Sequence, residues 1–233
     1  MLKGLMRNLI LLILFLSLAI AADDWTKNKK AIDVSIKKHE RALIKISDEI
    51  WHNAELALEE YKSSKILADY AEKNGFSLER GVAGMPTAFI ATYGSGRPRI
   101  GILGEFDANA GISQKAQSTK EALIEGAPGH GCGHNLYGTG SLGAAIAIKE
   151  LIEQGKIKGT IVFYGTPAEE TIFGKVWFAR AGLFNDLDVC MDWHPGDDME
   201  AATQSSKALI DFRVKFSGKA SHASADPWNG FSA

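Results

Sequence analysis

Short apolar runs that alternate with helical segments constrain the fold of this chain more than any other feature. Strands are predicted at residues 87–93, 99–103, 160–165 and 189–193. Helical patterns cover residues 25–74, with a second helix over 58–73, and then 140–154 and 174–181. Strands that alternate with helices in this way favour an α/β fold, in which a mixed, largely parallel sheet is flanked by helices.

Polar side chains follow three of these predicted strands. Glu105 and Asp107 come after the run 99–103, Glu169 and Glu170 after 160–165, and His194 after 189–193. Ligands bind at the carboxyl ends of the strands in such sheets. We therefore expect these side chains to meet in one site.

A glycine-rich stretch, Gly-His-Gly-Cys-Gly-His-Asn at 129–135, closes a long predicted loop over 107–135. It sets Cys132 and His134 two residues apart, and thiolate and imidazole are ligands that borderline-soft divalent metals prefer. Taken alone, the stretch fits a structural loop with a buried cysteine equally well. The polar clusters after the strands favour a metal site.

The adjacent acids Glu169 and Glu170 suit a metal-dependent hydrolase. Paired acids are usually part of a solvated surface, but these two follow an apolar strand. Because adjacent side chains diverge, one carboxylate can bind a metal while the other accepts a proton from the attacking water. His194 precedes Pro195, which fixes its direction, and Asp107 is either a ligand or the partner that orients a ligand histidine.

The segment from residue 208 has a different pattern. Apolar and charged residues alternate from 210 to 216, which predicts a half-buried strand and the start of another domain or sheet. His222 follows in a loop. It fits a surface histidine, or a donor that a moving domain brings to the site to stabilise an oxyanion.

The N-terminal residues 1–21 have the pattern of a secretory signal peptide. Lys3 and Arg7 precede an uncharged run of twelve residues, 9–20, and small residues at 19 and 21 suit cleavage after Ala21. The alternative is an uncleaved anchor, but the run is shorter than the roughly 20 residues that span a bilayer. We expect a secreted or periplasmic protein with no membrane attachment after cleavage. Cys132 and Cys190 could pair there, although a ligand role suits Cys132 better.

The net charge and the hydrophobic content indicate which kinds of binding partner are not expected. The formal net charge is −2, and 45% of the residues are hydrophobic. This balance gives no reason to expect binding to nucleic acid or to an anionic membrane. A dinucleotide-binding domain is a poor alternative, because no glycine fingerprint opens a helix after the first strand.

Taken together, the motifs resemble the M20 family of metallopeptidases, and most of all the amidohydrolase branch that includes the B subunit of p-aminobenzoyl-glutamate hydrolase. The matching pieces are Gly-His-Gly-Cys-Gly-His-Asn at 129–135, Thr-Pro-Ala-Glu-Glu at 166–170, Trp-His-Pro-Gly at 193–196, Gly-Lys-Ala-Ser-His-Ala at 218–223, Asp-Pro-Trp-Asn-Gly at 226–230, and a stretch expected to be helical at 53–61. They are spread over nearly all of the chain after residue 21.

The resemblance implies two divalent metal ions, Zn or Mn, and the hydrolysis of an amide bond in N-acyl amino acids or small dipeptide-like substrates. Substrates like p-aminobenzoyl-glutamate are favoured. Cys132, His134, Glu170 and His194 match metal ligands, Glu169 matches the general base, and His222 matches the lid histidine. The family also implies a homodimer or a heteromer with a paralogous subunit.

The resemblance further implies a zinc-exopeptidase-like catalytic domain over 22–207 and the start of a lid or dimerisation domain over 208–233. Family members are longer, and the return segment with a final histidine ligand is not among these residues. Asn135 stands where several relatives have aspartate. The alternative expectation is a catalytically incomplete fragment that at most binds metal or a partner subunit.

Overall fold

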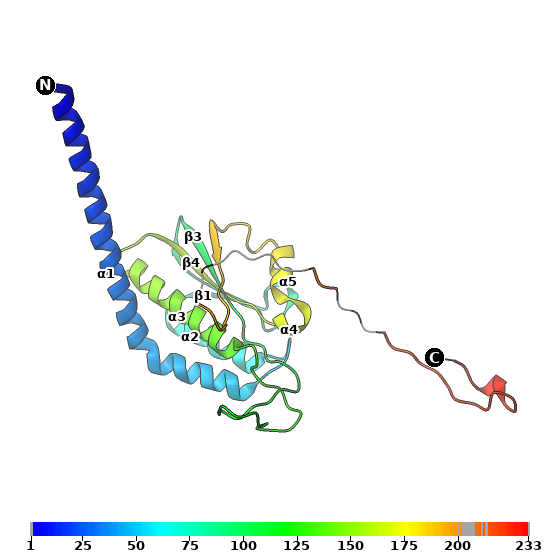
Figure 1. The fold of residues 1–233 in the computed structure, drawn as a ribbon. Coiled ribbons are helices and arrows are strands. Elements are labelled where there is room, and N and C mark those ends of the chain that lie inside the picture. The colour runs from blue at the N-terminus through cyan, green and yellow to red at the C-terminus, as the bar shows by residue number, and fades with distance from the viewer. Residues whose placement is uncertain (1, 200, 202–207, 211, 213, 233) are drawn as a thin grey trace. The chain divides into compact units, whose positions relative to one another are not determined.

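The computed structural model describes residues 2–199, 201, 208–210, 212 and 214–232, and side chains from residue 25 onward (Figure 1). The helices are α1 (Leu2–Asn53), α2 (Tyr61–Lys73), α3 (His134–Glu153), α4 (Glu169–Ile172) and α5 (Gly174–Arg180). The strands are β1 (Ser77–Arg80), β2 (Phe89–Ser95), β3 (Arg99–Gly104), β4 (Gly159–Gly165) and β5 (Val189–Met191). Two short 3₁₀ turns span Val82–Gly84 and Pro227–Asn229.

The five strands form one mixed sheet in the order β1-β2-β4-β3-β5. Strand β3 pairs in parallel with β4 and β5, whereas β2 pairs in antiparallel fashion with β1 and β4. The mixed sheet flanked by helices is therefore as expected, but its parallel part is confined to the β4-β3-β5 half. Sequence reasoning missed β1, because its four residues include a single apolar side chain, Leu78.

Both faces of the sheet are buried. In β4, Ile161 and Phe163 pack into one hydrophobic cluster while Val162 and Tyr164 pack into another. Alternate residues of a strand point to opposite faces, so these two clusters lie on the two sides of the sheet. Helices α1, α2 and α3 supply the first cluster, and Phe178 of α5 belongs to the second.

The connection between α1 and α2 is not helical, which corrects the expectation for residues 53–61. Helix α1 ends at Asn53, and Ala54 and Leu58 have positive φ values of 42° and 62°. The Glu55 carboxylate accepts hydrogen bonds from the backbone N–H groups of Lys62 and Ser63, at 3.0 and 2.8 Å. A side-chain acceptor in this place caps the first turn of α2, and the break lets the chain turn.

Helix α3 begins at His134, six residues before the predicted start at 140. Gly133 takes a left-handed conformation (φ 76°, ψ 24°) immediately before it. One turn later, a Cβ on Gly138 would lie 2.5 Å from the carbonyl oxygen of Glu105. The missing side chain at Gly138 therefore lets the first turn of α3 approach the carboxyl end of β3, where the predicted site lies.

The chain divides into two compact units, Met1–Gly196 and Asp197–Ala233. The predicted boundary after residue 207 adjoins residues outside the described part. Around the expected strand, the described residues between 208 and 218 form no strand, and Ile210, Phe212, Val214 and Phe216 are exposed. A strand with one apolar face needs neighbouring strands to pair with, and the described part of this unit has only an isolated bridge between Lys219 and Phe231.

Within the described residues, no helix contains a stretch long and apolar enough to cross a membrane.

Candidate metal centre

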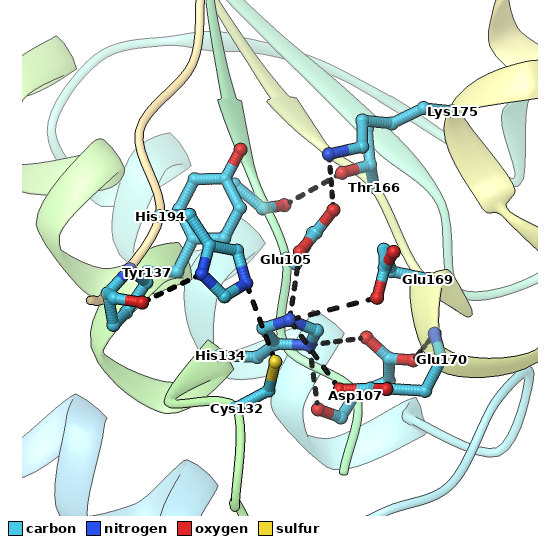
Figure 2. A network of polar contacts seen from close by, with 12 residues as sticks. Glu105, Asp107, Cys132, His134, Tyr137, Thr166, Glu169, Glu170, Lys175 and His194 are labelled. Atoms are coloured by element: carbon cyan, nitrogen blue, oxygen red, sulfur yellow. Dashed lines mark hydrogen bonds and ion pairs between the residues drawn. The ribbon is translucent and has the colours of Figure 1, made fainter. Parts of the chain in front are cut away.

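His134 is at the centre of the predicted site (Figure 2). The side chain is fully buried at the start of α3, and its Nδ1 lies 2.9 Å from Oδ1 of Asp107. A carboxylate only accepts hydrogen bonds, so Nδ1 carries the proton and donates it. Nε2 faces the other carboxylates, and once it gives up its own proton its lone pair is free for a metal ion, which is the arrangement of a histidine ligand held by a carboxylate.

Three glutamates surround Nε2 of His134. Oε2 of Glu105 lies 3.0 Å away, Oε1 of Glu170 3.8 Å and Oε2 of Glu169 4.0 Å. The second oxygen of Asp107, Oδ2, accepts a hydrogen bond from the backbone N–H of Glu170 at 2.9 Å. Asp107 therefore connects the histidine of α3 to the turn that carries both glutamates.

Cys132 and His194 lie on the outer side of this cluster. The Cys132 Sγ and the His194 Nε2 are 3.5 Å apart. His194 donates from Nδ1 to the Pro195 carbonyl at 2.9 Å, which leaves Nε2 directed at the sulfur. Both cysteines, Cys132 and Cys190, are free thiols.

The loop before α3 and the strand end after β5 hold these two residues. The Asn109 Oδ1 accepts hydrogen bonds from the backbone N–H groups of Gly131 and Cys132, both at 3.2 Å. The indole N–H of Trp193 donates to the Ser141 hydroxyl at 3.0 Å, which ties the strand end to α3. The loop before α3 is thus stabilised by a side-chain acceptor, Asn109, which pairs with backbone N–H groups that have no partner in a helix or strand.

Two sets of donors could each hold a metal ion. One is Cys132, His134 and His194, and the other is Glu105, His134 and Glu169; within each set all ligand atoms lie within 4.8 Å of one another. Among the described residues, the buried Nε2 of His134 and Oε1 of Glu170 have no hydrogen-bond partner. Buried polar atoms are normally paired, so a cation between these groups fits the residues present.

The electrostatics of the cluster also suit a cation. Burial lowers the pKa of His134, but the contacts with Asp107 and Glu105 outweigh it and raise the pKa to about 10. Burial and the charge of Glu170 raise the pKa of the Cys132 thiol to about 11. The raised pKa values of His134 and Cys132 both reflect the excess of negative charge in the cluster. A bound divalent ion would lower the pKa of Cys132, because a thiol that coordinates a metal is deprotonated.

Glu105 has a lysine partner that the sequence did not reveal. Lys175 of α5 forms an ion pair with the buried Glu105 and lies 3.5 Å from Oδ2 of Asp192. Burial raises the pKa of Glu105, but His134 and Lys175 outweigh it, so the pKa is lowered. Glu169 lies 4.0 Å from His134, which lowers its pKa, but burial together with the charges of Glu105 and Glu170 outweighs this and raises the pKa.

A pocket of about 520 Å³ opens on the outer pair, Cys132 and His194. The loop 130–136, the turn 194–196 and Trp51 at the end of α1 form its wall. Of the donor residues, Cys132 and His194 line this pocket.

The structure brings Cys132, His134, Glu169, Glu170 and His194 together. The strand ends predicted this for the two glutamates and His194. His222 lies in the second unit, where Nδ1 accepts hydrogen bonds from the N–H groups of Ser224 and Ala225 at 3.3 and 3.1 Å. The role of His222 stays a prediction.

Sequence reasoning did not single out Lys175 or Asn109, since a lone lysine in a helix and a lone asparagine in a loop carry no pattern.

The chain is similar to known proteins in sequence and in fold. Residues 114–221 match the peptidase family M20/M25/M40. The chain is 41% identical to the B subunit of p-aminobenzoyl-glutamate hydrolase of Escherichia coli over 203 residues, which cover 87% of this chain and 42% of that protein. It is 33% identical to human Xaa-Arg dipeptidase, over 81% of this chain and 43% of that protein.

Solved structures show the same fold. The YXEP protein of Bacillus subtilis, described as a dinuclear metal-binding peptidase from the M20 family, matches with a TM-score of 0.60 and 24% identity over 70% of this chain and 44% of that one. An aminobenzoyl-glutamate utilization protein from Klebsiella pneumoniae matches with a TM-score of 0.53 and 17% identity, over 71% of this chain and 46% of that one. This chain thus spans less than half the length of these four relatives. It carries a domain of the peptidase family M20/M25/M40.

Proposed function

We propose that the protein hydrolyses the amide bond of N-acyl amino acids or small dipeptide-like substrates with the help of two divalent metal ions. The observation that carries this proposal is the position of Glu169. It lies beside the donor cluster, 4.0 Å from the Nε2 of His134, and its side chain is 31% exposed. A carboxylate that adjoins a metal site and remains open to solvent is placed to act on water and substrate.

Cys132, His134, Glu170 and His194 would hold the metal ions, and Glu105 is an additional candidate. The thiolate and imidazole donors favour zinc, while the carboxylates also accept manganese. When bound, the metal ions supply a Lewis acid for the scissile carbonyl and lower the pKa of water. Asp107 fixes the orientation of the His134 ring from the side opposite to the ligand nitrogen.

Glu169 is the proposed general base and then the general acid. Its carboxylate is partly exposed beside the donor cluster, where a general base can reach both water and substrate. Glu169 would accept a proton from water and deliver it to the leaving amine.

The substrate class rests on the relatives. The B subunit of p-aminobenzoyl-glutamate hydrolase is 41% identical, and a protein named N-acetyl-L-cysteine deacetylase, from Bacillus subtilis, is 28% identical over 90% of this chain and 50% of that protein. Both names describe cleavage of an N-acyl amino acid. We favour an aromatic acyl group like p-aminobenzoyl, given the higher identity.

The proposal also covers the oligomeric state of the protein and its cellular location. The first relative is, by its name, one subunit of a hydrolase, which supports a heteromer with a paralogous partner, and a homodimer is the alternative. Residues 208–233 would begin a lid or dimerisation domain that carries His222. The charged start, apolar run and small residues of the first 21 positions support export to a secreted or periplasmic location.

The test uses Glu169→Ala in the purified protein with added zinc or manganese. We expect turnover of hippurate or p-aminobenzoyl-glutamate in the parent protein, no turnover in the variant, and the same amount of bound metal in both. Full activity of the variant would overturn the role of Glu169. Metal binding without any turnover in the parent protein would instead favour the alternative, a catalytically incomplete fragment.

A further inference from the structure

Glu60 is a buried carboxyl group that the proposed reaction does not use. It lies immediately before α2 and is fully buried. Its Oε1 accepts a hydrogen bond from the backbone N–H of Ala168 at 2.9 Å, and its Oε2 accepts one from the Thr87 hydroxyl at 2.8 Å. A buried carboxyl group is expensive unless both oxygens are paired, and here the pairing connects α2 to the turn after β4.

The turn that Glu60 reaches has an unusual backbone. Ala168 takes a left-handed conformation (φ 61°, ψ 35°) and is fully buried, and Glu169 and Glu170 follow it directly. Residues with a Cβ rarely adopt positive φ, so the surrounding structure must hold this conformation. The hydrogen bond from Ala168 to Glu60 is a contact that can do so, because it fixes the Pro167–Ala168 peptide group at the start of the left-handed residue that precedes Glu169.

We propose that Glu60 is a positioning residue of the metal centre, which holds the Ala168 peptide so that Glu169 and Glu170 face His134. The inference rests on the metal site of the proposed function. It assigns to Glu60 no contact with substrate or metal.

A second anchor acts on the other side of the same turn. Oδ2 of Asp107 accepts the N–H of Glu170 at 2.9 Å, two residues after the peptide that Glu60 binds. Without Glu60, the turn would keep the bond of the Thr166 hydroxyl to the Gly104 carbonyl at its start and the bond to Asp107 at its end, but no side-chain contact at Ala168. Glu169 and Glu170 could then rotate away from His134 as the left-handed peptide relaxes.

The chain offers a matched control at the same contact. The Ser64 hydroxyl, one turn further along α2, donates to the Thr87 carbonyl at 2.7 Å. Ser64→Ala therefore removes a buried hydrogen bond between α2 and Thr87 without touching the turn 166–170. Glu60→Gln keeps an oxygen acceptor for Ala168, whereas Glu60→Leu removes it at similar volume.

The first experiment titrates each metal-free protein with cobalt(II) alone and follows the thiolate-to-cobalt absorption of Cys132. We expect Glu60→Leu to weaken cobalt binding by about 10–100-fold, the usual effect of losing a group that supports a ligand. Glu60→Gln and Ser64→Ala should bind cobalt like the parent protein. Melting curves recorded without metal identify any variant that does not fold, and an unfolded Glu60→Leu is replaced by Glu60→Met.

The second experiment separates positioning from a general loss of stability. Glu170→Gln is combined with Glu60→Leu in a double-mutant cycle on cobalt affinity. If Glu60 acts through the turn, its removal costs little more once Glu170 has lost its ligand role. Additive losses, or a Glu60→Leu protein that binds cobalt normally, would overturn the inference. Failure of the parent protein to bind cobalt at Cys132 would instead refute the metal site itself.

Discussion

The donor cluster has two parts that are built differently. We call Glu105, Asp107 and His134 the inner triad, and Cys132 and His194 the outer pair. The side chains of the inner triad are at most 1% exposed and occupy the end of β3 and the start of α3. In the outer pair, Cys132 is half-buried in a loop and His194 is exposed beyond β5.

The difference shows that some donors of a metal site are fixed by the packing of the core, whereas others are held only by local loop contacts. The inner triad is buried and satisfies only part of its polar atoms, because Asp107 pairs with the Nδ1 of His134 while the Nε2 of His134 and both oxygens of Glu105 have no hydrogen-bond partner among the described residues. Its geometry is therefore part of the core. The outer pair remains solvated and is held by backbone contacts of the loop and of Pro195. We expect the inner triad to determine where metal binds and the outer pair to complete the coordination.

The largest effect should come from His134→Gln, which removes the one donor shared by both sets of ligands. Glutamine can still donate to Asp107, so the change acts mainly on the lone pair of Nε2. We expect zinc affinity to fall by more than about 100-fold, beyond the usual loss for a supporting residue. Isothermal titration of the metal-free protein measures it.

His130→Gln is the matched control for this change. His130 lies in the same loop, but its Nε2 contacts the Ile50 carbonyl at 3.0 Å rather than the donor cluster. Zinc affinity should remain close to that of the parent protein. An equal loss in both variants would mean that the loop fold, and not the Nε2 of His134, controls binding.

Asp107→Asn comes next, with an expected loss of metal affinity of about 10–100-fold. The amide can turn an N–H toward the Nδ1 of His134, which favours the wrong tautomer and leaves Nε2 protonated. Competition with a chelating dye gives the affinity. Asp188→Asn, whose carboxylate accepts the N–H of Arg99 away from the cluster, is the control. Unchanged affinity in Asp107→Asn would contradict the role of the inner triad.

His194→Ala should have a smaller effect, about tenfold in affinity or 1.4 kcal/mol, because it removes one exposed donor of the outer pair. The free energy of unfolding without metal should change by less than about 0.5 kcal/mol, as for other exposed residues. Urea unfolding of the metal-free protein checks this, and Asp107→Asn should be clearly destabilised in the same assay. A large loss of stability in His194→Ala would erase the distinction between the two parts.

Asn109→Ala should give the smallest loss of affinity. Its side chain accepts the N–H groups of Gly131 and Cys132, so the variant loosens the loop without removing a donor. Each lost hydrogen bond is worth about 1 kcal/mol of stability, and we expect metal affinity to fall by no more than about tenfold. The thiolate-to-cobalt absorption of Cys132 reports the loop directly, and an unaltered band and affinity would show that Asn109 does not hold the ligand.

Sequence reasoning predicted which side chains gather at one edge of the sheet where these side chains follow strands. Glu105, Glu169 and His194 each come after a predicted strand, and the carboxyl ends of β3, β4 and β5 lie at one edge because these strands run in parallel. The antiparallel half of the sheet was less predictable. Strand β1 has one apolar residue and is defined by its pairing with β2, which no local pattern encodes.

Other errors have the same origin. The start of α3 at His134 depends on the close approach of Gly138 to the end of β3, and the glycines around Cys132 locally favour a loop. The break between α1 and α2 depends on the Glu55 carboxylate reaching Lys62 and Ser63. In the second unit, alternation from residue 210 predicted a strand, but a strand forms only where a neighbour offers its hydrogen bonds.

By itself, the sequence determined which donors are available, because the identities of Cys132 and His134 in a glycine-rich loop, and of Glu169, Glu170 and His194 after strands, are local properties. Only the tertiary structure decided how these groups act on one another. Three contacts join residues that are far apart in the chain: the hydrogen bond of His134 to Asp107, the ion pair of Lys175 with Glu105, and the hydrogen bond of Ala168 to Glu60. Their energies depend on burial and on distances of a few ångströms, which are set when the sheet and helices pack.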